Sequence, residues 1–168
     1  MDSQMVLLRA LHIVFGTFWV GTDLFLTFVL LPRLRSLGRG IEQPVMVALM
    51  RVVPPVLMIS SIVVVVSGVW ITGSMRGWNL NWVLAGGWGS AMFIGLVGTV
   101  LALIVGFGVI PPLTMRMDKV ARGFEGRAPT GDADRQLQSL TTRITNLARA
   151  NSVLLIVVVA SMAVARFV

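Results

Sequence analysis

The chain has 168 residues, of which 56% are hydrophobic and only 12% are charged, and its mean hydropathy is +0.88. This composition is too apolar for an ordinary soluble domain, and the lack of cysteine excludes disulfides, thiolate metal sites and cysteine nucleophiles. The net charge of +7 does not indicate nucleic-acid binding, because the sequence holds no soluble basic segment with interleaved aromatic residues. We therefore expect a single all-α membrane domain over residues 1–168.

Four apolar stretches predict four transmembrane helices, at about residues 5–31, 52–75, 83–111 and 150–166. The pair Pro54–Pro55 is expected to mark the start of the second helix, since proline is tolerated in a first helical turn. A start near Pro44 would instead place a kink at this pair, with Arg51 inside it. In the third helix, small residues at four-residue spacing predict close approach of another helix or a flat ring.

The segment 112–149 is predicted to be a helical hairpin rather than a plain loop. Two sets of apolar residues follow a 4-3-4 spacing, with a turn between them at 126–131. The two sets are Leu113, Met117, Val120 and Phe124, and Leu137, Leu140, Ile144 and Leu147. The third and fourth helices would then continue beyond the membrane and pair, either only to close the bundle or to form a docking surface for a partner.

Basic residues predict the orientation of the bundle. Eleven lie in the segments 32–51 and 112–149, against three at Arg9, Arg76 and Arg166. Because basic loops stay on the cytoplasmic side, this asymmetry predicts an up-down bundle with both termini outside and the hairpin 112–149 in the cytoplasm. The basic segments would also attract anionic lipid headgroups.

The first helix carries the only histidine and a single intramembrane acid. His12, Gly16, Trp19 and Asp23 share one helical face, and the His and Asp are about 16 Å apart along the axis. Ionisable groups are costly in lipid, so this face should meet protein, a cofactor or water. We expect Asp23 to have a basic or amide partner, with Arg51 the first choice and Arg149 or Asn151 as alternatives; a proton-relay role stays open.

The segment LHIVFGTFWVGTDLFLTFVLLPRL resembles the first helix of a bacterial superfamily of four-helix membrane proteins. That superfamily includes copper resistance protein D, the heme-dependent membrane protoporphyrinogen oxidase and a predicted integral membrane family of unknown function. The shared features are His12, then Trp19 with Gly21, and the closing Leu-Pro-Arg that ends at Arg33. The resemblance implies a multi-pass protein of the bacterial inner membrane, with heme b at His12 and a functional role for Arg33. The residues after Arg33 depart from the oxidase branch, which argues against protoporphyrinogen oxidation.

Three functions follow as hypotheses. In the first, His12 is an axial ligand of heme b, Gly16 and Trp19 contact the ring, and Met75, Met92 or Met162 completes the iron site. A His12 pair across a homodimer would serve equally. In the second, the chain is a non-catalytic accessory subunit of a larger electron-transfer or photosynthetic membrane complex. In the third it handles copper, which favours thioether and imidazole ligands. The sequence does not decide whether the protein is an enzyme.

Overall fold

The computed structural model describes residues 3–79, 81–84, 86–123 and 131–167, and every regular element in these ranges is helical. Four helical rods are long and apolar enough to cross a membrane: Ser3–Ser36, Gly40–Arg76, Gly87–Arg122 and Asp132–Val164. The prediction of an all-α protein with four helices of membrane-spanning character is confirmed. Its orientation in a membrane stays a prediction.

The first rod contains a widened turn. It consists of α1 (Ser3–Phe25), a π-helical segment η1 (Leu26–Leu30) and α2 (Leu31–Ser36). Pro32 is the second residue after η1, and a proline has no N–H to donate to the carbonyl four residues earlier. A π turn just before a proline is therefore a local response of the backbone to the missing bond. The rod ends at Ser36, and Gly38, which precedes the next helix, has a φ of 85° that glycine adopts at little cost.

The second rod corrects one prediction. Helix α3 runs from Arg39 to Arg76 without a break, so Pro54 and Pro55 lie inside the helix and do not begin it. The chain reverses at Gly38, and helix formation starts as soon as that turn is complete. At 1.5 Å per residue, 38 residues span about 57 Å, which exceeds a hydrocarbon core of about 30 Å. The first part of α3 therefore extends well beyond one membrane span.

The second half of the chain repeats this plan. A short 3-10 helix, η2 (Asn81–Leu84), precedes α4 (Gly87–Leu103), so the α-helix starts four residues later than the predicted 83. A second π-helical segment, η3 (Ile104–Val109), leads into α5 (Ile110–Arg122), and Pro111 follows it. Helix α6 (Asp132–Val164) is continuous, and the expected separate span from 150 is its second half.

The helical hairpin predicted for 112–149 is present in the described residues, where α5 packs along the first half of α6. Most of the expected turn at 126–131 lies outside the described residues. Gly131, its last residue, has a φ of 63° and precedes α6. Whether this hairpin lies in the cytoplasm is a matter of orientation, which stays a prediction.

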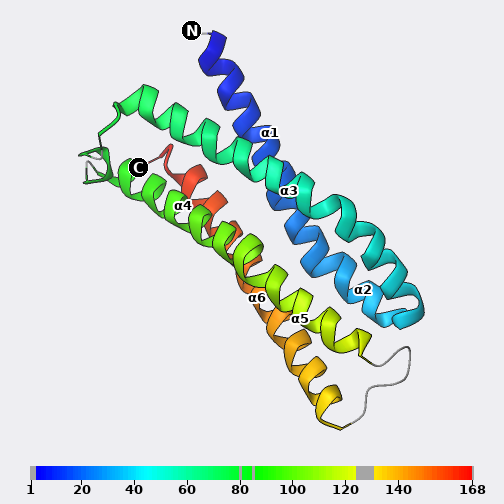
Figure 1. Ribbon diagram of the computed structural model, residues 1–168. Coiled ribbons are helices and arrows are strands. Elements are labelled where there is room, and N and C mark those ends of the chain that lie inside the picture. Colours follow the sequence, from blue (N-terminus) through cyan, green and yellow to red (C-terminus); the bar gives the residue numbers. More distant parts are fainter. Residues whose placement is uncertain (1–2, 80, 85, 124–130, 168) are drawn as a thin grey trace.

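The helices associate as two antiparallel pairs, α1 with α3 and α4 with α6 (Figure 1). The pairs meet where α1 and η1 contact α6, and there Trp19, Val64, Ala102 and Leu155 form a small buried core. Many large apolar side chains point outward instead; Ile13, for example, is 64% exposed. So much exposed apolar surface is typical of a protein surrounded by lipid.

Candidate functional site

His12 is fixed to α3 through one ring nitrogen. Its Nδ1 lies 2.9 Å from the carbonyl oxygen of Val64 and 3.1 Å from Oγ of Ser67. A carbonyl can only accept, so Nδ1 carries the proton and donates it to Val64. The proton of Ser67 goes to the Val63 carbonyl, 2.6 Å away, which leaves the serine oxygen free to accept from His12. In the neutral ring, Nε2 is then the nitrogen with a free lone pair.

The imidazole ring packs tightly against α3, because Gly68 offers no side chain. A Cβ built on Gly68 would lie 2.9 Å from Cε1 of His12 and 3.9 Å from Nε2. No described residue hydrogen-bonds Nε2, and the His12 side chain is half-buried. A ligating histidine usually donates its other ring N–H to a carbonyl, an oxygen or water in this way. The geometry thus holds the ring in place and leaves Nε2 available.

Gly16 and Trp19, which are predicted to contact a heme ring, contact other helices of the bundle instead. Trp19 is only 5% exposed and belongs to the core that joins the two pairs. A Cβ on Gly16 would lie 3.7 Å from Cγ2 of Val64, so Gly16 faces α3. The face that carries His12 and Asp23 does point to protein, as the sequence predicts. Gly16 and Trp19, however, pack against helices and do not line an open space for a porphyrin ring.

The candidate methionine ligands lie on three different helices. Met75 accepts a hydrogen bond from Arg9, with 3.4 Å between Nη2 and Sδ. It follows Ser67 by eight residues, about 12 Å along the axis, so it does not share the depth of His12 as predicted. Met162 packs over Gly95, where an added Cβ would lie 2.9 Å from its Cε. Met92 is half-buried on α4, one turn from Gly95.

Among the residues that the structure describes, no group of three or more His, Asp or Glu side chains lies close enough to hold a metal ion. Met117 of the α5–α6 hairpin receives a hydrogen bond from Thr141, with 3.6 Å between Oγ1 and Sδ. The described methionine contacts are therefore packing and hydrogen-bonding contacts.

Asp23 is half-buried and has partners on α6. Its Oδ2 accepts a hydrogen bond from Oγ of Ser152 at 2.5 Å, and the side chain of Asn151 also hydrogen-bonds the carboxyl. Ser152 is fully buried, and Oδ1 of Asn151 is the buried side-chain acceptor without a partner among the described residues. Asp23 therefore joins the first helix to the last, in the half of the bundle away from His12.

The predicted partner Arg51 is not used. It lies exposed on α3, and the ion pairs among the described residues do not include it. Register explains why. His12 lies opposite residues 64–67, so Asp23, eleven residues later, lies opposite about 53–56 in an antiparallel pair. Arg51 is beyond that level, whereas α6 brings a hydroxyl and an amide directly to the carboxyl.

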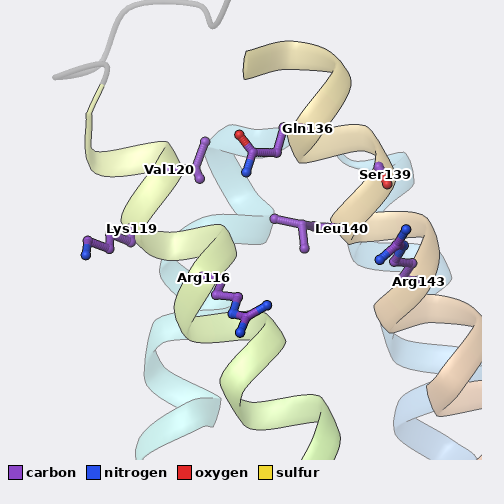
Figure 2. Close-up of a pocket in the computed structure, with 7 residues that line it drawn as sticks. All are labelled: Arg116, Lys119, Val120, Gln136, Ser139, Leu140 and Arg143. Carbon is purple, nitrogen blue, oxygen red and sulfur yellow. The ribbon is translucent and has the colours of Figure 1, made fainter. Parts of the chain in front are cut away.

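Two surface grooves lie beyond this polar site. One, of about 370 Å³, runs between α5 and α6 (Figure 2). The other, of about 320 Å³, is lined by Phe28, Val29, Pro32, Arg33 and Ser36. Arg33, which the resemblance marks as functional, is therefore exposed beside the proline of the first rod.

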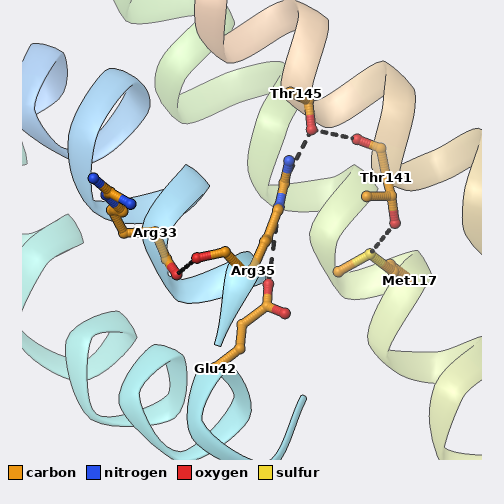
Figure 3. Close-up of polar contacts among 7 residues, drawn as sticks. Arg33, Arg35, Glu42, Met117, Thr141 and Thr145 are labelled. Atoms are coloured by element: carbon orange, nitrogen blue, oxygen red, sulfur yellow. Dashed lines mark hydrogen bonds and ion pairs between the residues drawn. The ribbon is translucent and has the colours of Figure 1, made fainter. Parts of the chain in front are cut away.

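The neighbouring Arg35 makes a further polar contact between the two helix pairs, at the end of the bundle near Gly38. Its Nη2 donates to Oγ1 of Thr145 on α6 at 3.0 Å, and its Nε lies 3.9 Å from Oε1 of Glu42 on α3. Figure 3 shows the side chain of Arg33 directed away from Thr145. Arg35 thus has a structural role at this end of the bundle. Arg33 does not share that role, and its side chain is exposed.

Sequence reasoning missed the partners Ser67, Ser152 and Arg35. The serines carried a weak signal, because each is a hydroxyl residue in or beside a long apolar run. Nothing in the sequence states which helix faces which, so His12 and Asp23 could not be matched with them. Arg35 could not be told from the basic residues around it, since its contact depends on the register between α2 and α6.

Comparisons with protein-family models, with curated proteins and with solved structures find no match to this chain. The resemblance of the first helix to the copper resistance and oxidase superfamily therefore stays a prediction.

Proposed function

We propose that this chain is a multi-pass membrane protein in which His12 is an axial ligand of heme b. One observation carries the proposal: Nδ1 of His12 donates to the Val64 carbonyl at 2.9 Å, which leaves Nε2 as the ligating atom. Ser67 supports the same tautomer, and Gly68 fixes the ring on α3.

The porphyrin ring would lie outside the buried core of this chain, and a neighbouring protein would complete the heme site. Gly16 and Trp19 are engaged in packing, so a ring would lie against the outer half of α1 and α3. A second copy or another subunit would cover its far side and supply the other axial ligand. Bound heme would provide one-electron redox chemistry. This chain's part is to hold the imidazole, fix its tautomer and exclude water with its apolar surface.

Charge distribution supports an orientation with both termini outside and the α5–α6 hairpin in the cytoplasm of a bacterial inner membrane. The argument is the asymmetry of eleven basic residues against three. Cysteines introduced at Gly131 and Asn79 test it in intact cells. We expect an impermeant thiol reagent to label the site at 79 and spare the one at 131, and the reverse pattern would contradict the orientation.

Absorbance of the purified protein, expressed with ample heme, tests the ligand. We expect a Soret band in wild type, none in His12→Gly, and partial recovery when imidazole is added to His12→Gly. Rescue separates a missing ligand from a damaged fold. Ser67→Ala is the matched control, because it removes a neighbour of the ring but keeps Nε2. A colourless wild-type protein, or a His12→Gly variant with full heme content, would reject the proposal.

The second candidate is a non-catalytic accessory subunit, in which His12 only joins α1 to α3. The observation in its favour is the tight fit of the ring over Gly68. In that case the wild-type protein is colourless and His12→Gly lowers the melting temperature without any spectral change.

A further inference from the structure

The groove between α5 and α6 is lined by basic and polar side chains of both helices (Figure 2). Its lining residues are Arg116, Lys119 and Val120 of α5 with Gln136, Ser139, Leu140 and Arg143 of α6. Arg116, Gln136 and Leu140 extend into the space between the helices, whereas Lys119 points away from α6. The space of about 370 Å³ thus combines cationic groups, hydrogen-bonding groups and an apolar floor.

No acidic side chain lines this groove. The acids at the start of α6 have other partners: Asp132 pairs with Arg135 at 2.9 Å, and Asp134 accepts from Gln138 at 2.9 Å. Within the described part of the chain, Arg116, Lys119 and Arg143 make no ion pair. Guanidinium groups favour phosphate, which they bind through two parallel hydrogen bonds. No acidic side chain of the groove pairs with these cations, and the guanidinium groups among them are suited to binding a phosphate.

The level of the groove along the bundle indicates where that phosphate comes from. The Asp23–Ser152 hydrogen bond aligns α1 with α6. Arg9 precedes Asp23 by 14 residues and Arg166 follows Ser152 by 14 residues, so both lie about 21 Å away on the same side. On the other side, Arg149 precedes Ser152 by three residues. These levels are about 26 Å apart, close to the thickness of a hydrocarbon core.

Arg143 lies six residues beyond Arg149 along α6, about 9 Å further from the apolar layer. The polar headgroup zone on each side of a bilayer is about 5–8 Å deep. The levels of Arg9, Arg166 and Arg149 fall slightly inside the hydrocarbon boundary, so this step places Arg143, at the membrane-side end of the groove, in the headgroup zone. Leu140 and Val120 lie about one turn further out than Arg143 and Arg116, on the side of the groove that faces away from the apolar layer.

We propose that the α5–α6 groove binds the headgroup of an anionic phospholipid, with Arg116 and Arg143 on the phosphate. Gln136 and Ser139 supply hydrogen bonds to headgroup hydroxyls, and Lys119 adds charge at the rim. This site is separate from His12 and does not depend on heme. Bound lipid would hold α5 against α6 at the membrane surface.

Native mass spectrometry of the detergent-solubilised full chain tests the site with short-chain phosphatidylglycerol as the probe. Phosphatidylcholine and inorganic phosphate are the comparison ligands. We expect phosphatidylglycerol to bind at least tenfold more tightly than phosphatidylcholine, since a basic side chain near a lipid surface contributes about fivefold. Arg116→Gln/Arg143→Gln should abolish this preference. Arg122→Gln/Arg135→Gln removes the same charge from the same two helices outside the groove, and should keep it.

Equal loss in both double variants would mean diffuse attraction to a basic surface and would overturn the proposal. So would equal binding of the two lipids by wild type. Displacement of the lipid by inorganic phosphate at the same concentration would assign the groove to free phosphate instead. Should the groove variant fail to fold, raising the salt from low to about 0.5 M must weaken phosphatidylglycerol binding by wild type about tenfold; binding that ignores salt contradicts the proposal.

Discussion

The two helix pairs share a backbone plan but fill it with different side chains. In each, a helix ends in a π segment and a proline, continues for a few turns, reverses, and returns as one long helix. The sequence repeats the junction: Phe28-x-x-Leu31-Pro32 corresponds to Phe107-x-x-Ile110-Pro111, 79 residues later. Because the backbone plan is shared, side chains present only in the first pair are not explained by that plan.

At the positions 79 residues after His12, Gly16, Trp19 and Asp23, the second pair has Ala91, Gly95, Gly98 and Ala102. Gly95 and Gly98 let Met162 and Val158 of α6 approach the backbone of α4, and Ala102 is buried in the core. Two helices can therefore pair closely on this plan without any ionisable side chain. His12 and Asp23 are not required for helix pairing as such, which points to roles in binding or in joining the two pairs.

The largest effect should come from filling the glycine contact of the second pair. A Cβ on Gly98 would lie 2.6 Å from Cγ2 of the buried Val158. We expect Gly98→Ala to lower the free energy of unfolding by about 2–3 kcal/mol, through overpacking. Gly21→Ala is the control, because nothing lies within 4 Å of its added Cβ, and it should be neutral or stabilising by up to about 1 kcal/mol. Thermal unfolding in detergent measures both, and similar losses would contradict the close contact.

A smaller effect is expected where the pairs meet. Asp23→Ala gives the first pair the residue type of the second and leaves Ser152 and Asn151 buried without the carboxyl. The expected cost is about 1–2 kcal/mol. A double-mutant cycle with Ser152→Ala should show positive coupling, because the two side chains bond each other. Strictly additive losses would show that the bond contributes nothing to stability.

The smallest effect separates two neighbouring arginines. Arg35→Gln removes the contacts with Thr145 and Glu42 and should cost under about 1 kcal/mol, since these groups are partly exposed. Arg33→Gln should leave the melting temperature unchanged, because its side chain points away from Thr145. If Arg33→Gln is the more destabilising change, the division of roles between the two arginines is wrong.

How far the sequence leads can be judged from the same residues. Apolar run lengths located four helices, and 4-3-4 spacing placed His12 and Asp23 toward the protein. Hydropathy could not locate the start of α3, because Pro54–Pro55 is typical of a first helical turn, whereas α3 begins directly after the turn at Gly38 and contains both prolines. The choice of Ser152 over Arg51 depends on the register that Trp19 and Leu155 set between α1 and α6. Such registers arise from side-chain fit across helices, which one-dimensional periodicity does not encode.

The prolines give the bundle an uneven stiffness. Pro32 and Pro111 follow the π segments, and Pro54 and Pro55 lie opposite the level of Asp23, so three of the four rods lose backbone bonds within a turn or two of one depth. Helix α6 has no proline and crosses that depth with its ladder unbroken. A bending force on the molecule would therefore bend these three rods near the prolines more easily than it would bend α6. The α5–α6 hairpin would tilt about this depth, and α6, which is unbroken, would transmit the movement from one end of the protein to the other.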